Sequence, residues 1–187
     1  MSQRDSGYER KERDLYETPP WVTETLFPHL REYRQAWEPA CGSGAMADVL
    51  RARGIVLCSD IEPTMEGAAI KDFLLEPWGA FRDHSVDAVI TNPPYELATE
   101  FIEHALRIME PVGGLVAMLL RTDFDHAKSR AYLFRDCPAF AKKLVLMKRI
   151  AWFVEADGKP KASPSFNHAW YIWDWKHEGA PTLAYGP

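Results

Sequence analysis

The chain has 187 residues with a formal net charge of −5, and its 47% hydrophobic content is typical of a folded domain with a sizeable core rather than of a disordered protein. No apolar run approaches the 18 residues of a membrane-spanning helix, and the polar, charged segment 1–14 leads us to expect neither a signal peptide nor a transit peptide. Three cysteines at irregular spacings favour a cytoplasmic protein without a disulfide framework or a metal site.

The pattern of apolar residues, prolines and glycines predicts helices that alternate with strands. Thr18 followed by two prolines is typical of a helix start, and Gly54 is typical of the position just past a helix end. A continuous apolar run at residues 115–120 is typical of a buried parallel strand. In chain order we expect a short helix through residue 26, strand 35–38, turn 39–44, helix 45–53, strand 55–59, strand 71–74, strand 86–91, helix 96–109, strand 115–120, helix 127–136, strand 144–150 and strand 170–175.

Strands that alternate with helices predict an α/β fold, in which a mostly parallel sheet is covered by helices on both faces. The aromatic segment 170–175 alternates between two dissimilar faces, which favours core packing on a strand over a role in binding. Residues 155–165 read as a surface loop, and no internal repeat or domain boundary is evident.

Charge is distributed unevenly along the chain. Residues 121–161 carry ten Lys or Arg against five Asp or Glu, whereas residues 1–120 carry eleven against twenty. A basic stretch on an acidic protein is typical of a phosphate-facing surface, and an ordinary solvated face is an equally good interpretation.

The most informative motif is Asn92-Pro93-Pro94-Tyr95, directly after the apolar run 86–91. It lies at the carboxyl end of a predicted strand, where ligands bind in open α/β sheets. The two prolines remove two backbone donors, so the carbonyl acceptors have no competing N–H groups. Asn92 adds an amide oxygen, and Tyr95 adds a flat aromatic face. This set suits a planar substrate that carries an NH2 group.

A second motif runs from Glu38 to Gly44, between a predicted strand and a predicted helix. Gly42 and Gly44 allow the backbone to approach a ligand closely, although the spacing differs from that of a phosphate loop and of a nicotinamide fingerprint. Asp60 follows at the next strand exit and Asp72 at the one after. Each acid alone is more typical of a solvated loop, but the ordered series indicates a cofactor site in which an acid accepts ribose hydroxyls.

Taken in this order, the motifs resemble those of the class I S-adenosylmethionine-dependent methyltransferases, and most closely the amino-directed adenine-N6 DNA methyltransferases, over residues 16–122. The resemblance implies a Rossmann-like sandwich with a mostly parallel seven-stranded sheet, whose antiparallel last strand would be 170–175. It implies S-adenosylmethionine as cofactor, and a single methyltransferase domain over residues 15–187, after a mobile tail 1–14. Without a separate target-recognition domain, a partner subunit would be a source of specificity for the nucleic acid.

The resemblance also assigns roles to residues of this chain. Asn92, Pro93, Pro94 and Tyr95 match the catalytic motif, in which the Asn92 Oδ1 and the Pro93 carbonyl accept the two hydrogens of the target amine. Substrate contacts are expected from Tyr95, Arg121 and Phe166, although Arg121 and Asp123 could instead pair with one another and His168 is expected to be structural or exposed. The residues expected to bind the cofactor are Tyr16, Thr18, Pro19, Glu38, Pro39, Ala40, Gly42, Gly44, Asp60, Ile61, Asp72, Phe73 and Asn92.

The function implied is methyl transfer to adenine N6 in DNA by direct in-line attack. The Asn-Pro-Pro-Tyr motif also fits enzymes that methylate an RNA base, at guanine N2 or adenine N6, and enzymes that methylate glutamine N5 in proteins. A further alternative is a binding module that keeps the fold without the chemistry.

Overall fold

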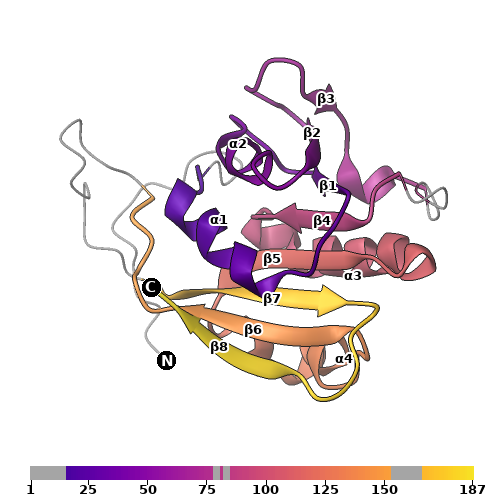
Figure 1. The fold of residues 1–187 in the computed structure, drawn as a ribbon, viewed down its shortest axis with the longest axis vertical. Helices are drawn as coiled ribbons and strands as arrows, with labels where there is room; N and C mark the ends of the chain where they lie inside the picture. Colours follow the sequence, from indigo (N-terminus) through magenta and orange to yellow (C-terminus); the bar gives the residue numbers. More distant parts are fainter. Residues whose placement is uncertain (1–15, 78–80, 82–84, 153–165) are drawn as a thin grey trace.

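The computed structural model describes residues 16–77, 81, 85–152 and 166–187. Within this part of the chain an eight-stranded sheet has the strand order β3-β2-β1-β4-β5-β7-β6-β8, with helices on both of its faces (Figure 1). The strands are β1 (Gln35–Glu38), β2 (Ile55–Asp60), β3 (Ala69–Ile70), β4 (Ala88–Thr91), β5 (Leu115–Arg121), β6 (Phe140–Leu146), β7 (His168–Asp174) and β8 (Thr182–Gly186). The α-helices are α1 (Pro20–Leu26), α2 (Ala45–Leu50), α3 (Ala98–Met109) and α4 (Ala131–Phe134).

Strand direction confirms the expected α/β fold. β1 to β5 pair in parallel, and β7 lies antiparallel between β5 and β6, as predicted for segment 170–175. β8 was not expected, and it adds an eighth strand in parallel beside β6. Its side chains are mostly exposed, so its sequence carries little of the apolar alternation by which strands are recognised. The expected tail 1–14 and loop 155–165 lie outside the described residues.

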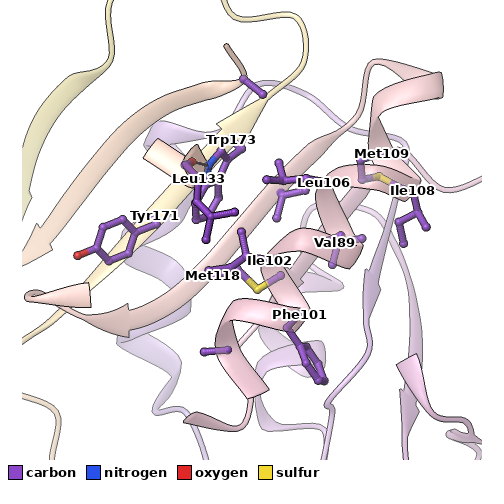
Figure 2. Close-up of a cluster of buried hydrophobic side chains, with 14 of the residues drawn as sticks. Val89, Phe101, Ile102, Leu106, Ile108, Met109, Met118, Leu133, Tyr171 and Trp173 are labelled. Carbon is purple, nitrogen blue, oxygen red and sulfur yellow. Dashed lines mark hydrogen bonds between the residues drawn. The ribbon is translucent and has the colours of Figure 1, made fainter. Parts of the chain in front are cut away.

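Alternate residues of the strands supply two apolar cores, one on each face of the sheet. On one face α3 and α4 pack over Met118, Tyr171 and Trp173, as Figure 2 shows. On the other face α1 and α2 pack over the alternate residues of the same strands, including Trp170 and Ile172. The expected structural role of the aromatic segment 170–175 is therefore confirmed, since Trp170 and Trp173 are fully buried.

Two predicted elements differ from the structure near polar side chains. Residues 71–74 are not a strand, because the Asp72 Oδ1 accepts from the Leu74 N–H at 3.0 Å and starts the 3-10 turn Phe73–Leu75. Residues 127–136 do not form one helix. The Arg130 Nε donates to the Phe124 carbonyl at 2.7 Å, and short turns precede the single-turn helix α4.

The boundaries of other predicted elements shift as well. The sixth strand begins at Phe140 and ends at Leu146, four residues earlier than each expected end, because the Phe140 ring packs against Phe134 and Trp173. Helix α2 ends at Leu50 rather than at residue 53, and the following residues continue as turns. No helix of the described residues combines the length and the apolar character needed to cross a lipid bilayer.

The N-terminal segment is fastened to β7, which is distant in sequence. The Trp170 Nε1 donates to the Val22 carbonyl at 2.9 Å, and the Arg31 Nε lies 3.0 Å from both carboxylate oxygens of Asp174. These contacts fix α1 over the sheet and so set the position of the chain that precedes it.

We predict that Trp170→Phe lowers the free energy of unfolding by about 1–3 kcal/mol, because it removes the indole hydrogen bond and leaves a space in a close-packed core. Urea denaturation at neutral pH measures the change. Trp21→Phe is the control. Trp21 lies half-buried on α1, and its replacement should lower the free energy of unfolding clearly less. Equal losses in the two variants would contradict the role of the Trp170 contact.

Candidate functional site

The site follows from the order of the strands. From β1 the chain crosses to β2 on one side, whereas from β4 it crosses to β5 on the other side. Since β1 and β4 are neighbours, their exits diverge, and a crevice forms at this topological switch point. The glycine turn (residues 39–44) leaves β1, and the proline corner (residues 92–95) leaves β4. Both predicted motifs therefore border the same crevice.

A cavity of about 680 Å³ lies at this crevice, within the size range of small-molecule sites. The expected site residues that line it are Tyr16, Thr18, Glu38, Pro39, Ala40, Gly42, Asp60, Ile61, Asp72, Phe73, Asn92 and Pro94. The lining residues that were not expected are Glu17, Cys41, Ser43, Ala45, Met46, Glu62, Thr64, Lys71, Leu74, Glu96, Leu97 and Phe101. Most of these are sequence neighbours of the motifs, which is the signal that could have found them.

The glycine turn is held by the carboxylate of Asp60. Its Oδ2 accepts from the Gly42 N–H at 2.9 Å, and its Oδ1 accepts from the Glu62 N–H at 3.0 Å. Gly44 does not line the cavity; it precedes α2 with a φ of +87°, and a Cβ there would lie 2.6 Å from the Met65 Sδ. Gly44 therefore shapes the turn, while Gly42 faces the cavity.

Glu38 is a buried acid in the cavity wall, with 2% of its surface exposed. Its carboxylate accepts from the Ala47 N–H, but the Oε2 has no hydrogen-bond partner among the described residues. Burial, together with the neighbouring Cys58, raises the pKa of Glu38 well above its usual value. A buried acceptor without a donor is costly, so this atom is suited to receive a donor, and above all a cation, from a ligand.

Asp72 and Phe73 form another part of the wall. The Asp72 carboxylate caps the 3-10 turn through Leu74, as described above, and its side chain is otherwise exposed. The Phe73 ring lies 5.1 Å from the Trp37 ring and 4.9 Å from the Phe101 ring, and only 2% of Phe73 is exposed. Phe73 therefore offers the cavity a small, rigidly packed apolar surface.

At the proline corner the Asn92 amide has a defined orientation. Its Nδ2 donates to the Tyr16 carbonyl at 3.4 Å, which leaves Oδ1 on the opposite side of the amide as an acceptor. Pro93 is buried, whereas Pro94 lines the cavity. Tyr95 lies beside the cavity wall, and its hydroxyl oxygen is 2.6 Å from the Nε2 of His168. His168 is buried, which confirms its structural placement and excludes the exposed one.

The remaining expected residues lie outside the cavity. Pro19 precedes the first residue of α1. The Arg121 Cζ is 4.0 Å from the centre of the Phe166 ring, and its Nη2 is 3.1 Å from the Asp123 Oδ2, so the structure has the pairing that the sequence left as the alternative to substrate contact. Lys143 likewise pairs with Asp125. These ion pairs neutralise part of the basic stretch, and no potential metal site of three or more His, Cys, Asp or Glu occurs among the described residues.

No protein-family model matches the sequence, and no curated protein matches it. Several solved structures share its fold. A protein of Pyrococcus horikoshii assigned as an RNA methyltransferase aligns with a TM-score of 0.58 at 15% identity, over 87% of this chain and 87% of its own. A protein of Listeria monocytogenes assigned as a class I S-adenosylmethionine-dependent methyltransferase aligns with a TM-score of 0.52 at 16% identity, over 88% of this chain and 62% of its own.

A third structure is a modification subunit of a protein assigned as a type I restriction enzyme from Vibrio vulnificus. It aligns with a TM-score of 0.53 at 12% identity, over 91% of this chain and 46% of its own. The chain thus spans less than two thirds of the length of the Listeria and Vibrio proteins. At these identities the similarity is one of fold, and the chain has the Rossmann-like fold of the class I methyltransferases.

Proposed function

We propose that the chain binds S-adenosylmethionine in the 680 Å³ cavity and transfers its methyl group to an exocyclic amine, specifically N6 of adenine in DNA. One observation carries the proposal. Asn92, whose Nδ2 donates to the Tyr16 carbonyl and whose Oδ1 lies on the other side of the amide, lines the same cavity as Glu38 and Asp60. An acceptor for an amine and a wall suited to a charged cofactor therefore share one crevice.

The donor set of the cavity fits this cofactor. The Glu38 Oε2 is a buried acceptor in need of a donor, which the ammonium group of the methionine moiety supplies. The Asp60 carboxylate, already oriented by two backbone N–H groups, keeps lone pairs for the ribose hydroxyls. Asp72 and Phe73 provide a carboxylate and an apolar face for the adenine. When bound, the cofactor supplies a methyl group activated by a sulfonium sulfur.

The proline corner positions the amine. An exocyclic amine of a nucleobase is a weak nucleophile, because its lone pair is delocalised into the ring. Asn92 Oδ1 and the Pro93 carbonyl accept its two hydrogens and thereby direct the lone pair toward the methyl group. Acceptors fixed where positive charge develops lower the barrier without reorganisation, and they hold the nitrogen in a near-attack position. No covalent bond to the protein is needed.

Aromatic side chains near the proline corner favour a nucleobase over a glutamine amide as the acceptor. Besides Tyr95, the ring of Tyr16 lies 5.5 Å from that of Trp152. Stacking on such rings is worth about 1–3 kcal/mol per base and offsets part of the cost of taking a base out of a duplex. The choice of adenine in DNA rests on the resemblance of residues 16–22 to the adenine-N6 group, with a partner subunit as a source of target recognition.

Transfer of a tritiated methyl group from S-adenosylmethionine tests the proposal, with unmethylated DNA, ribosomal RNA and a release factor as acceptors. Label recovered in DNA as N6-methyladenine is the expected result. Label in guanine or adenine of RNA, or in a protein glutamine, would support methyl transfer to an NH2 group but would contradict DNA as the substrate. A raised melting temperature with the cofactor and no label in any acceptor would favour a binding module.

We predict that Asn92→Ala lowers the turnover number about 100-fold or more, by analogy with the loss of one preorganised donor from an oxyanion hole. The affinity for the cofactor should stay close to that of the wild type, because Asn92 is only one of many lining residues. Single-turnover methylation and calorimetric titration measure the two quantities. Wild-type turnover in this variant would refute the role of Asn92.

We predict that Glu38→Gln has opposite effects on stability and on cofactor binding. The raised pKa of Glu38 means that the wild type without ligand loses stability relative to the variant as the pH rises above about 4.5, the usual pKa of the group, and through the folded-state pKa. Cofactor affinity should fall about 10-fold to 100-fold, since a hydrogen bond to a charged group is worth about 1.5–3 kcal/mol.

Denaturation curves between pH 4 and pH 8 and calorimetric titration with the cofactor test this pair of effects. Glu66→Gln is the matched control, because Glu66 is exposed and lies outside the cavity lining. A Glu38→Gln variant that binds the cofactor as tightly as the wild type would show that the carboxylate does not hold the ammonium group.

A further inference from the structure

His168 is the first residue of β7 and pairs in register with Arg121 of β5. Only 2% of its surface is exposed. Burial and, second, the charge of Arg121 lower the pKa of His168 to about 4, so the imidazole is neutral at physiological pH. The charged groups that act on the ring are Arg121 and, in the opposite direction, Asp123. A buried neutral histidine on a central strand is a rigid hydrogen-bonding point.

The hydrogen-bond partner of His168 is Tyr95, the last residue of the proline corner. The Nε2 of His168 lies 2.6 Å from the hydroxyl oxygen of Tyr95, 73 residues away in sequence. In one tautomer the imidazole Nε2 accepts a hydrogen bond from the phenol O–H, and in the other its N–H donates to the phenol oxygen, so both tautomers hold the ring of Tyr95 at the same place. The backbone before Tyr95 is already restricted by two prolines. The hydrogen bond to His168 restricts the rotation of the side chain as well.

The same histidine also supports a row of aromatic rings around the corner. The ring of Trp152 meets His168 edge-on, with centres 5.2 Å apart at 83°, and the ring of Tyr16 lies 5.5 Å from Trp152. The Tyr16 carbonyl in turn accepts from the Asn92 amide. The row therefore runs from Tyr95 through His168 and back to Asn92, and its members come from four separate segments of the chain.

We propose that His168 is a positioning residue, which fixes the Tyr95 ring beside Asn92 so that a planar base stacks on a surface that is already ordered. The inference rests on the proposed function and deepens it, because an ordered aromatic face serves a nucleobase and is of no use to an aliphatic amide. A side chain held in its productive orientation before binding loses less entropy when the substrate arrives.

A double-mutant cycle on Tyr95 and His168 tests the inference. Tyr95→Phe keeps the ring and removes the hydroxyl, and His168→Leu keeps the bulk and removes the hydrogen bond. Each change should lower kcat/KM for DNA about threefold to tenfold, the usual effect of one hydrogen bond, and should leave the cofactor Kd unchanged. The double variant should be no worse than His168→Leu alone, because the hydrogen bond between Tyr95 and His168 is already lost in that variant.

Rescue distinguishes positioning from a general loss of packing. His168→Gln places an amide where Nε2 lies and should recover most of the loss, whereas His168→Asn is too short to reach Tyr95 and should behave like His168→Leu. His168→Asn replaces His168→Leu in the double-mutant cycle if His168→Leu does not fold. Tyr132→Phe is the control, since Tyr132 is an exposed tyrosine whose hydroxyl donates to Glu103 on α3 and not to a residue of the proline corner.

The outcomes are distinct. Additive losses in the double variant, no rescue by glutamine, or wild-type kcat/KM in Tyr95→Phe would overturn the positioning role while leaving the methyltransferase function intact. A wild-type protein that methylates no amine in DNA, RNA or protein would overturn the proposed function and, with it, this inference. Non-additive losses with rescue would establish the role of His168.

Discussion

Parallel pairing of β1 with β4 is the interaction on which the site depends. Ala36 pairs with Ala88 and Trp37 with Val89, and all four side chains are buried. Because the chain leaves these two strands toward opposite sides of the sheet, nothing in the sheet itself fills the space between their exits. The glycine turn and the proline corner are close only because this pairing holds. A shift in register between β1 and β4 would separate Glu38 from Asn92 even if each local motif kept its conformation.

The N-terminal segment supplies the part of the site that the sheet does not. Its Tyr16 carbonyl accepts from Asn92, 76 residues away, and its helix α1 is fastened through Val22 to Trp170, 148 residues away. Two strands of the sheet, β4 and β7, therefore hold the chain that closes the cavity. Trp170 is a residue of the core, but its indole nitrogen couples the stability of the fold to the position of Tyr16 and so to the orientation of the Asn92 amide.

The elements that could be predicted from the sequence are those whose pattern is local. β1 begins and ends as expected, and β5 is recognisable because its burial on both faces leaves an uninterrupted apolar run. β3 and β8 are exposed strands defined by pairing with β2 and β6, which no local pattern records. The expected helix 127–136 is replaced by turns that depend on the contact of Arg130 with Phe124.

The polar walls of the cavity were easier to predict than the contact between Tyr95 and His168, for the same reason. Glu38 and Asp60 each end a strand that is recognisable from its own residues, so their convergence follows from the order of the motifs, whereas Asp72 falls in the expected strand 71–74, which the structure replaces with a 3-10 turn. Tyr95, in the turn that follows β4, and His168, at the start of β7, come within 2.6 Å of each other, and no local pattern of the sequence indicates that contact. A contact between side chains that are distant in sequence can be recognised only when the pairing of the strands is known.

Burial shifts the pKa values of two ionisable groups at the site, Glu38 and His168, with different consequences. It raises the pKa of Glu38 and lowers that of His168, so the neutral form of each is favoured in the protein without ligand. His168 has a neutral phenol as partner, so its hydrogen bond requires no charge on the imidazole. The Glu38 Oε2 has no such partner among the described residues, and a cation brought by a ligand would reverse the balance and favour the carboxylate. The same desolvation thus makes one residue a fixed support and the other a group whose ionisation depends on the ligand.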